Sequence, residues 1–285
     1  MGAHMTTDQV AAPSVPSSEG TAEFYDVFNL LLIDVWDENF HQGYWEDEND
    51  ESSNRRAAER MTQLLIDHSG LENGGRVLDV GCGIGLSAFQ LAGATPAEIV
   101  GISNNQAQID EANRRSRAQG LADRVTFEYA DVYDLPYPEG SFDVVWVFDA
   151  LLHMDRLRTL RELRRVLRPG GRVVVTDKLQ TGPMSPEDER AVSEFMTDLQ
   201  ASPILWENEY RALVAEADLE VAELLDISKH TYKSSTRTIE AVNAKYDALI
   251  DRYGEQVIPM LELLRNPVGL VKELGYLLCV AKKPA

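Results

Sequence analysis

Two segments near the start of the chain carry apolar residues at three- and four-residue spacings. Such spacing places the apolar side chains on one face of a helix. The pattern predicts helices over residues 21–37 and 55–68. The apolar residues that define them are Phe24, Val27, Phe28, Leu31 and Leu32 in the first segment and Met61, Leu64 and Leu65 in the second.

From residue 76 onward, short runs rich in β-branched residues alternate with amphipathic segments. This alternation is typical of βαβ units and a parallel sheet. The sequence therefore predicts an α/β fold with a Rossmann-like, doubly wound sheet. Strands are expected over 76–80, 98–102, 125–129, 142–147 and 172–177, with helices over 87–91, 105–119 and 156–167 between them. The Arg-Pro-Gly-Gly turn at 168–171 is expected to end the last of these helices.

Beyond residue 177 the pattern predicts a helix over 208–217, a strand over 219–227, a long helical stretch over 234–264 interrupted near Pro259, and a final strand over 275–280. We therefore expect five regions along the chain. They are a disordered arm with a vector scar (1–20), N-terminal helices (21–70), a core domain (71–228), a helical lid insertion (229–271) and a closing strand of the core (272–285).

The formal net charge of the chain is −20, and its basic residues are scattered rather than clustered. Such a field opposes the approach of phosphate backbones and anionic lipid, so neither nucleic acid nor a membrane is expected as a partner. No run of about 18 apolar residues is present to span a bilayer, and no export signal is visible, so we expect a cytoplasmic protein. The spacing of the Cys, His, Asp and Glu residues indicates no metal site. The sequence leaves a homo-oligomer open.

A glycine-rich turn follows the first predicted strand of the core, with Asp79, Gly81, Gly83 and Gly85 in the segment Asp-Val-Gly-Cys-Gly-Ile-Gly. At the carboxyl ends of parallel strands, glycines let the backbone approach a ligand closely. Dinucleotide-binding chains usually carry G-x-G-x-x-G at this place to seat a pyrophosphate. The different spacing, and the acidic residue two positions before the first glycine, argue against NAD.

With this turn the sequence resembles the first motif of the class I S-adenosylmethionine-dependent methyltransferases, and the resemblance extends in four ordered pieces over residues 71–178. It implies a seven-stranded sheet, S-adenosylmethionine as cofactor and S-adenosylhomocysteine as product. The acidic residue and glycines of the turn would then bind the methionine end, and Ser103 and Gln108 the ribose. Asp131, followed by Val132, would accept a hydrogen bond from the adenine. Ser103 and Asp131 have a second interpretation, as helix caps.

The segment before the core reads His-Gln-Gly-Tyr-Trp and ends at Tyr44 and Trp45. Two aromatic rings after a glycine suit a wall over a flat or cationic ligand, although ordinary packing also explains them. Together with Tyr25 upstream, the segment resembles the entrance of small-molecule natural-product methyltransferases such as the rebeccamycin sugar O-methyltransferase. This resemblance implies that Tyr25, Tyr44 and Trp45 contribute to the cofactor site.

The segment after the fourth predicted core strand contains Asp149, Leu152 and His153, at the sheet edge where chemistry occurs in this fold. O-methylating relatives often carry paired histidines here, and Leu152 stands in place of one of them. The ordinary pKa of a histidine suits His153 to the role of general base, and a structural role in the loop is the alternative. Asp177 is expected to orient the imidazole or to bind the acceptor, with capping as its alternative. Asp149 is expected to support the cofactor.

The combined prediction is an enzyme that transfers a methyl group from S-adenosylmethionine to a small-molecule acceptor. The acceptor atom is expected to be a hydroxyl of a secondary metabolite, with His153 as base. The replaced histidine and the apolar lid leave open an N- or C-methyltransferase that acts on a terpenoid or alkaloid. A cofactor-binding module without catalysis is a third interpretation, which the intact glycine turn, Asp131 and His153 disfavour.

Overall fold

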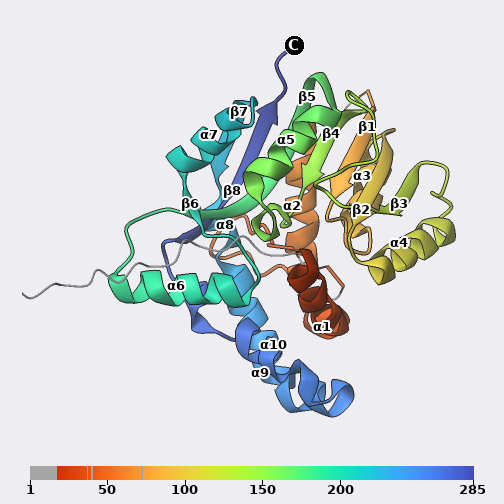
Figure 1. Cartoon of the computed structure of the whole chain (residues 1–285). Coiled ribbons are helices and arrows are strands. Elements are labelled where there is room, and N and C mark those ends of the chain that lie inside the picture. Colours follow the sequence, from red (N-terminus) through yellow and green to blue (C-terminus); the bar gives the residue numbers. More distant parts are fainter. Residues whose placement is uncertain (1–17, 37, 40, 72) are drawn as a thin grey trace, which may run out of the picture.

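The computed structural model describes residues 18–36, 38, 39, 41–71 and 73–285. They form one central sheet with helices packed around it (Figure 1). The strand order is β3-β2-β1-β4-β5-β8-β7, and the short β6 pairs with β5. β8 runs antiparallel to β5 and β7, and the other pairs are parallel. This sheet confirms the predicted Rossmann-like fold. The strands are β1 (Arg76–Val80), β2 (Glu98–Ser103), β3 (Val125–Tyr129), β4 (Phe142–Val147), β5 (Leu167–Gln180), β6 (Leu205–Trp206), β7 (Glu220–Asp226) and β8 (Leu274–Lys282).

Helices cover both faces of the sheet, because successive residues of each inner strand point to opposite faces and both sets are apolar. Leu78 of β1 lies in one buried cluster with Leu163 of α5 and Tyr210 of α7. Its neighbour Val77 lies in a second cluster with Met61 of α2 and Ile109 of α4. The covering helices are α2 (Asn54–Ser69), α3 (Leu86–Ala94), α4 (Gln106–Ala118), α5 (Arg156–Val166) and α7 (Glu207–Glu216).

The N-terminal helix α1 (Ser18–Trp36) packs against a helical layer that projects away from the sheet (Figure 1). Phe28 and Leu31 of α1 share a buried cluster with Val242 of α9. Trp36 Nε1 of α1 donates a hydrogen bond to Thr238 Oγ1 of α9 at 3.0 Å. The insertion between β7 and β8 therefore holds α1 in position. It consists of α8 (Ser228–Thr231), α9 (Lys233–Tyr253), η2 (Glu255–Val257), α10 (Ile258–Leu264) and η3 (Pro267–Leu270), while η1 (Leu151–His153) and α6 (Pro186–Asp198) lie earlier in the chain.

The break in the long C-terminal helix lies five residues before the predicted place. The sequence predicts an interruption near Pro259, but α9 ends at Tyr253. Gly254 has a φ of +85°, a backbone conformation that glycine adopts readily, and it ends the helix there. Pro259 instead lies in the first turn of α10, where its missing N–H leaves no hydrogen bond unmade.

Three further features differ from or extend the sequence prediction. The predicted arm reaches residue 20, but residues 18–20 belong to α1, while residues 1–17 lie outside the described residues. β5 begins at Leu167 and includes the predicted turn at 168–171. The two-residue β6 is too short to show a periodic pattern. Within the described part of the chain, no helix is long and apolar enough to cross a membrane.

Candidate active site

A cavity of about 490 Å³ lies at the carboxyl ends of β1, β2, β3 and β4, and α1 forms one of its walls. Five residues of α1 line it, which are Thr21, Tyr25, Phe28, Asn29 and Leu32. The other lining residues are Glu38, Asn39 and His41 after α1, Val80 to Ile84 and Leu86 at the glycine turn, Ile102 to Asn105 and Gln108 after β2, Tyr129 to Tyr133 after β3, and Phe148, Asp149, Ala150, His153 and Met154 after β4. The cavity therefore joins most of the sequence-predicted site residues.

The three glycines of the turn have different surroundings. A Cβ atom added at Gly81 would lie 2.6 Å from the Cβ of Ala150, and one at Gly85 would lie 2.5 Å from the ring of Phe127. Gly83 has a φ of +52°, and the position of its missing Cβ has no atom within 4 Å. Gly81 and Gly85 thus allow close packing, whereas Gly83 faces open space in the cavity wall.

Asp79 lies behind the glycine turn and does not itself line the cavity. Its side chain is buried, and Oδ2 has no hydrogen-bond partner among the described residues. Burial raises the pKa of Asp79 to about 7. Since buried carboxyl oxygens nearly always have a donor, this oxygen fits a ligand that brings an N–H or ammonium group to the turn, as the methionine end of S-adenosylmethionine would.

The predicted ribose and adenine residues meet along one wall of the cavity. Ser103 Oγ donates to Gln108 Oε1 at 2.9 Å, and Gln108 Nε2 donates to Asn29 Oδ1 of α1 at 3.0 Å. Asn105, and not Ser103, caps α4. Asp131 accepts a hydrogen bond from the backbone N–H of Tyr133 at 2.9 Å, which fixes its carboxylate at the end of β3. The residues predicted to bind the ribose and the adenine therefore line the same cavity.

His153 is held at the opposite part of the cavity by one hydrogen bond on each ring nitrogen. Nδ1 lies 2.7 Å from the carbonyl oxygen of Gln200, and Nε2 lies 3.1 Å from the hydroxyl of Tyr25. Because a carbonyl oxygen only accepts, Nδ1 carries the proton and Nε2 accepts from the tyrosine. Burial lowers the pKa of His153 below its ordinary value. The imidazole is therefore neutral at neutral pH, with its lone pair on Nε2.

Comparison with known proteins identifies the family. A family described as a methyltransferase domain matches residues 78–175. The methyltransferase GfsG of Streptomyces halstedii is 35% identical over 94% of this chain and 95% of its own length. The 27-O-demethylrifamycin SV methyltransferase of Amycolatopsis mediterranei is 36% identical over 94% of this chain and 98% of its own. The crystal structure of the [4+2]-cyclase SpnF has a TM-score of 0.84 at 30% identity, over 96% of this chain and 98% of that one.

The chain belongs to the class I S-adenosylmethionine-dependent methyltransferases of natural-product biosynthesis. The enzyme transfers a methyl group from S-adenosylmethionine to a small-molecule acceptor and leaves S-adenosylhomocysteine. The residues predicted to bind the cofactor at the glycine turn, after β2 and after β3 line the same cavity as the neutral imidazole of His153.

In this methyltransferase Asp177 does not reach His153, so the prediction that it orients the imidazole needs correction. Asp177 is fully buried in β5 and forms a two-fold ion pair with Arg156, at 2.8 Å to Nε and 3.2 Å to Nη2. It does not line the cavity. The carbonyl of Gln200, just after α6, orients the imidazole instead. Leu152, in place of a second histidine, packs into an apolar cluster with Met196 of α6.

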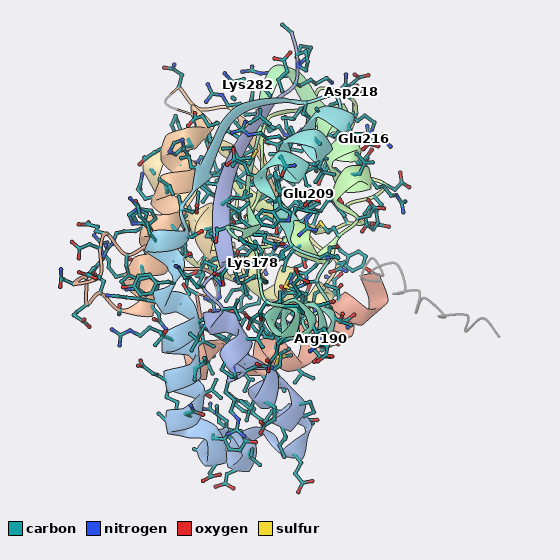
Figure 2. All side chains as sticks on the ribbon, turned by 90° about the vertical axis from the view of Figure 1, so that its left-hand side faces the viewer. Lys178, Arg190, Glu209, Glu216, Asp218 and Lys282 are labelled. Carbon is teal, nitrogen blue, oxygen red and sulfur yellow. The ribbon has the colours of Figure 1, made fainter. Side chains whose placement is uncertain are left out.

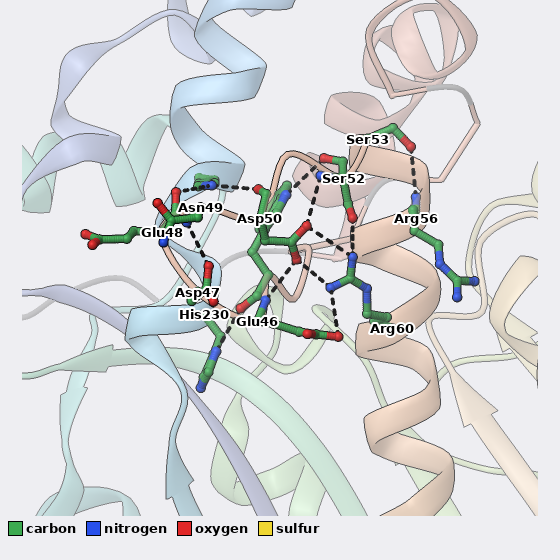
Figure 3. Close-up of polar contacts among 12 residues, drawn as sticks. Glu46, Asp47, Glu48, Asn49, Asp50, Ser52, Ser53, Arg56, Arg60 and His230 are labelled. Atoms are coloured by element: carbon green, nitrogen blue, oxygen red, sulfur yellow. Dashed lines mark hydrogen bonds and ion pairs between the residues drawn. The ribbon is translucent and has the colours of Figure 1, made fainter.

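Tyr44 and Trp45 also lie away from the cavity of the methyltransferase, contrary to the prediction that they bind the cofactor. The ring of Tyr44 stacks on His230, with centroids 4.2 Å apart. Trp45 is 1% exposed, and its backbone N–H and carbonyl both bond to His230, at 2.9 Å and 2.8 Å. Figure 3 shows the following acidic loop, in which Asp50 accepts from Arg60 of α2. These aromatic residues thus anchor the loop to α2 and α8.

The sequence analysis did not select His41, although it belongs to the same segment. His41 lines the cavity, and its ring stacks on Phe148 with centroids 3.7 Å apart. Nε2 lies 3.3 Å from Ser87 Oγ, and Nδ1 lies 3.5 Å from Asp149 Oδ2. The sequence did contain a signal for His41, because it lies two residues before Gly43 in the segment whose aromatic residues were expected to form a wall of the site. Asp149 itself does line the cavity, as a cofactor role requires.

Proposed function

We propose that this methyltransferase methylates a hydroxyl group of a secondary metabolite and that His153 is the general base. The observation that carries the proposal is the unprotonated Nε2 of His153 in the cavity, with the opposite nitrogen fixed on the Gln200 carbonyl. Two relatives, the 27-O-demethylrifamycin SV methyltransferase and the O-methyltransferase resE of Aspergillus sclerotiorum, carry names that state O-methylation, and resE is 32% identical over 94% of this chain.

Catalysis on a hydroxyl needs a proton acceptor, because a neutral alcohol is a weak nucleophile. When bound, S-adenosylmethionine supplies an activated methyl group on a sulfonium. Nε2 of His153 would take the hydroxyl proton as the acceptor oxygen receives the methyl group, and the cofactor would leave as S-adenosylhomocysteine. The Gln200 carbonyl holds the Nδ1–H and stabilises the imidazolium that forms. α1 forms one wall of the cavity in which this transfer would take place.

Tyr25 occupies the position that the acceptor hydroxyl would take. Its hydroxyl lies 3.1 Å from Nε2 of His153, and burial, together with the charge of Asp149, raises its pKa well above the ordinary value. Tyr25 therefore donates to the base without giving up its proton. In the proposed reaction the acceptor hydroxyl replaces the tyrosine at Nε2, so Tyr25 keeps the imidazole oriented until the acceptor arrives.

N-methylation of an amine is a second candidate, favoured by the charges that line the cavity. The lining contains the carboxylates Glu38, Asp131 and Asp149 and no lysine or arginine. Residues 1–17, 37, 40 and 72, outside the described part, contain no lysine or arginine either. Such a wall suits a neutral or cationic acceptor. It does not suit a diphosphate, although geranyl diphosphate C-methyltransferase shares the fold, with a TM-score of 0.71 at 20% identity.

The test is to find the atom that receives the methyl group. Purified enzyme is incubated with methyl-labelled S-adenosylmethionine and a panel of hydroxyl- and amine-bearing polyketides, terpenoids and alkaloids. S-adenosylhomocysteine is quantified, and the labelled carbon is located by two-dimensional NMR. A label on oxygen supports the proposal. A label on nitrogen or carbon of the preferred acceptor contradicts it, and cofactor turnover without a labelled product separates solvent hydrolysis from methyl transfer.

A further inference from the structure

Two carboxyl groups flank the glycine turn, and the structure gives them different relations to the cavity. Asp79 on β1 lies behind the turn and is 3% exposed. Asp149, two residues after β4, lines the cavity and has a side chain that is 12% exposed. Of these two residues, Asp149 is the one that lines the cavity, whereas Asp79 offers its unpartnered oxygen from behind the turn.

Asp149 stands between the cofactor wall and the base. Its neighbour Ala150 contacts the turn so closely that a Cβ at Gly81 would lie 2.6 Å away. His153 follows four residues later at the end of η1. If methyl transfer takes place between the glycine turn and His153, as proposed above, Asp149 would lie on the same side of the cavity as the sulfur of the bound cofactor.

Several donors fix Asp149 as an ionised carboxylate with a defined direction. Tyr276 donates to Oδ1, and the backbone N–H of Gln42 donates to Oδ2 at 3.0 Å. Nδ1 of His41 lies 3.5 Å from Oδ2. The backbone of Asp149 has a φ of +53° and its N–H donates to Thr176 Oγ1 at 3.2 Å. Burial acts to raise the pKa of Asp149, but His41, Tyr276 and Gln42 hold it below its ordinary value.

We infer that the Asp149 carboxylate lets the enzyme bind the sulfonium of S-adenosylmethionine in preference to the thioether of S-adenosylhomocysteine. The two molecules carry the same amino-acid and adenosine groups and differ in the methyl group and in the positive charge on sulfur. An anion beside the sulfur stabilises only the charged form, so it favours substrate binding and product release. This inference rests on the proposed function, in which the methyl group is transferred between the glycine turn and His153. It gives Asp149 a role in distinguishing the two cofactor forms, a role that Asp79 does not have.

The experiment compares dissociation constants for S-adenosylmethionine and S-adenosylhomocysteine, measured by calorimetry in the absence of acceptor. The variants are Asp149→Asn and, as matched control, Asp79→Asn. Asparagine tolerates the positive φ at position 149 and removes the charge. Its amide oxygen can still accept from the backbone N–H of Gln42, and its NH2 group can donate to the Tyr276 hydroxyl in place of the bond that it received. We expect Asp149→Asn to weaken S-adenosylmethionine binding at least about fivefold more than S-adenosylhomocysteine binding, the lower end of a charge–charge effect at contact distance. Asp79→Asn should weaken both by similar factors.

S-adenosylhomocysteine binding reports in the same titration whether the variant is folded. If Asp149→Asn binds neither ligand, Asp149→Gly provides the second variant, because glycine adopts the positive φ without strain, and the same change in the affinity ratio is expected. Equal losses for the two ligands in both Asp149 variants would overturn the inference, as would a change of the ratio in Asp79→Asn alone. Location of the methyl label on nitrogen or carbon would contradict the proposed function and leave this inference standing.

Discussion

At the residue scale, the two hydrogen bonds of His153 determine what the imidazole can do. The Gln200 carbonyl and the Tyr25 hydroxyl assign one tautomer, in which the lone pair of Nε2 accepts a hydrogen bond from Tyr25. The neighbouring carboxylate of Asp177 is hydrogen-bonded to Arg156 and not to the imidazole, so it acts on His153 only through its charge. A backbone carbonyl therefore performs the orienting task that an acidic side chain performs in many other histidine bases.

Replacement of His153 by alanine should lower kcat by about a hundredfold or more, the range for loss of general-base assistance. The dissociation constant of S-adenosylmethionine should change little, because the glycine turn, Asp79 and Asp131 remain in place. Single-turnover kinetics together with calorimetry measure both quantities. Tyr25→Phe is the matched control, since it removes only the hydroxyl on Nε2 and keeps the base. If the alanine variant kept the wild-type kcat, His153 would not be the base. The alignment of acceptor and cofactor alone would then account for catalysis, and an amine acceptor would be favoured.

The pH dependence of kcat should report the same imidazole. The base is active when neutral, and burial lowers the pKa of His153 below 6.5. The rate should therefore decline as the pH falls through the lowered pKa, with the midpoint of this decline below 6.5. The low-pH limb should disappear in the His153→Ala variant. If the decline in kcat of the wild-type enzyme had its midpoint above pH 6.5, the prediction that burial lowers the pKa of the base would be wrong.

At the element scale, α1 determines the shape of the cavity, although it lies outside the sheet. Asn105 Nδ2 and Gln108 Nε2 of the core donate to Asp26 and Asn29 of α1, at 2.9 Å and 3.0 Å. On its other side, α1 packs on α9 through Leu31, which is fully buried. The helix is thus held between the cofactor wall and the helical insertion.

Truncation of Leu31 to alanine should loosen α1 and weaken cofactor binding without direct contact with the cavity. Buried leucine-to-alanine changes cost roughly 2 to 5 kcal/mol, and here much of that cost falls on the docking of one helix. We expect a higher dissociation constant for S-adenosylmethionine and faster amide hydrogen exchange in α1, with the sheet protected as before. Ile33→Ala, at a position that is 57% exposed, is the control. Unchanged affinity in Leu31→Ala would show that α1 docks independently of this contact.

The ion pair between α5 and β5 supports the fold rather than the chemistry. Arg156 and Asp177 are 7% and 0% exposed. Asp177→Asn leaves a buried guanidinium without its partner, which typically costs roughly 3 to 5 kcal/mol. We expect a lower Tm and a lower midpoint of urea unfolding, with kcat of the folded enzyme close to wild type. Asp198→Asn on the exposed surface of α6 is the control. A large fall in kcat at unchanged stability would show that Asp177 contributes to catalysis and not only to the stability of the fold.

The elements of the sheet could be predicted because parallel strands buried on both faces carry nearly continuous apolar runs, such as β4, and because glycines mark the turns. The glycine turn and the polar residues after β2 and β3 could be placed for the same reason. The partner of Asp177 could not, since the order of residues along the chain does not show that Arg156 turns inward. The Gln200 carbonyl was equally hidden, because any residue supplies a backbone oxygen.

At the scale of the whole molecule, the strong negative charge is spread over the surface. On the face shown in Figure 2, acidic and basic residues are interspersed. Glu209, Glu216 and Asp218 lie at and beside α7, with Lys282 near the top of the view and Lys178 and Arg190 further down. The net charge of −20 attracts divalent cations as a diffuse atmosphere. An effect of magnesium on activity could therefore have either of two causes, a bound ion or screening of the negative charge of the protein. A comparison at matched ionic strength separates the two.

Methyl transfer should need no divalent metal. No group of three or more His, Cys, Asp or Glu side chains in the described part of the chain is arranged to hold one. Hard cations such as magnesium require several oxygen ligands around one point. The three cavity carboxylates already have donors, Asp149 in Tyr276 and Gln42, Asp131 in the N–H of Tyr133, and Glu38 in Arg115. Activity in excess chelator should equal activity in magnesium chloride when sodium chloride adjusts the ionic strength. If activity is lost in chelator and is restored by magnesium chloride but not by sodium chloride, the reaction has a metal-dependent step. The acceptor would then be expected to carry anionic groups that bind the metal.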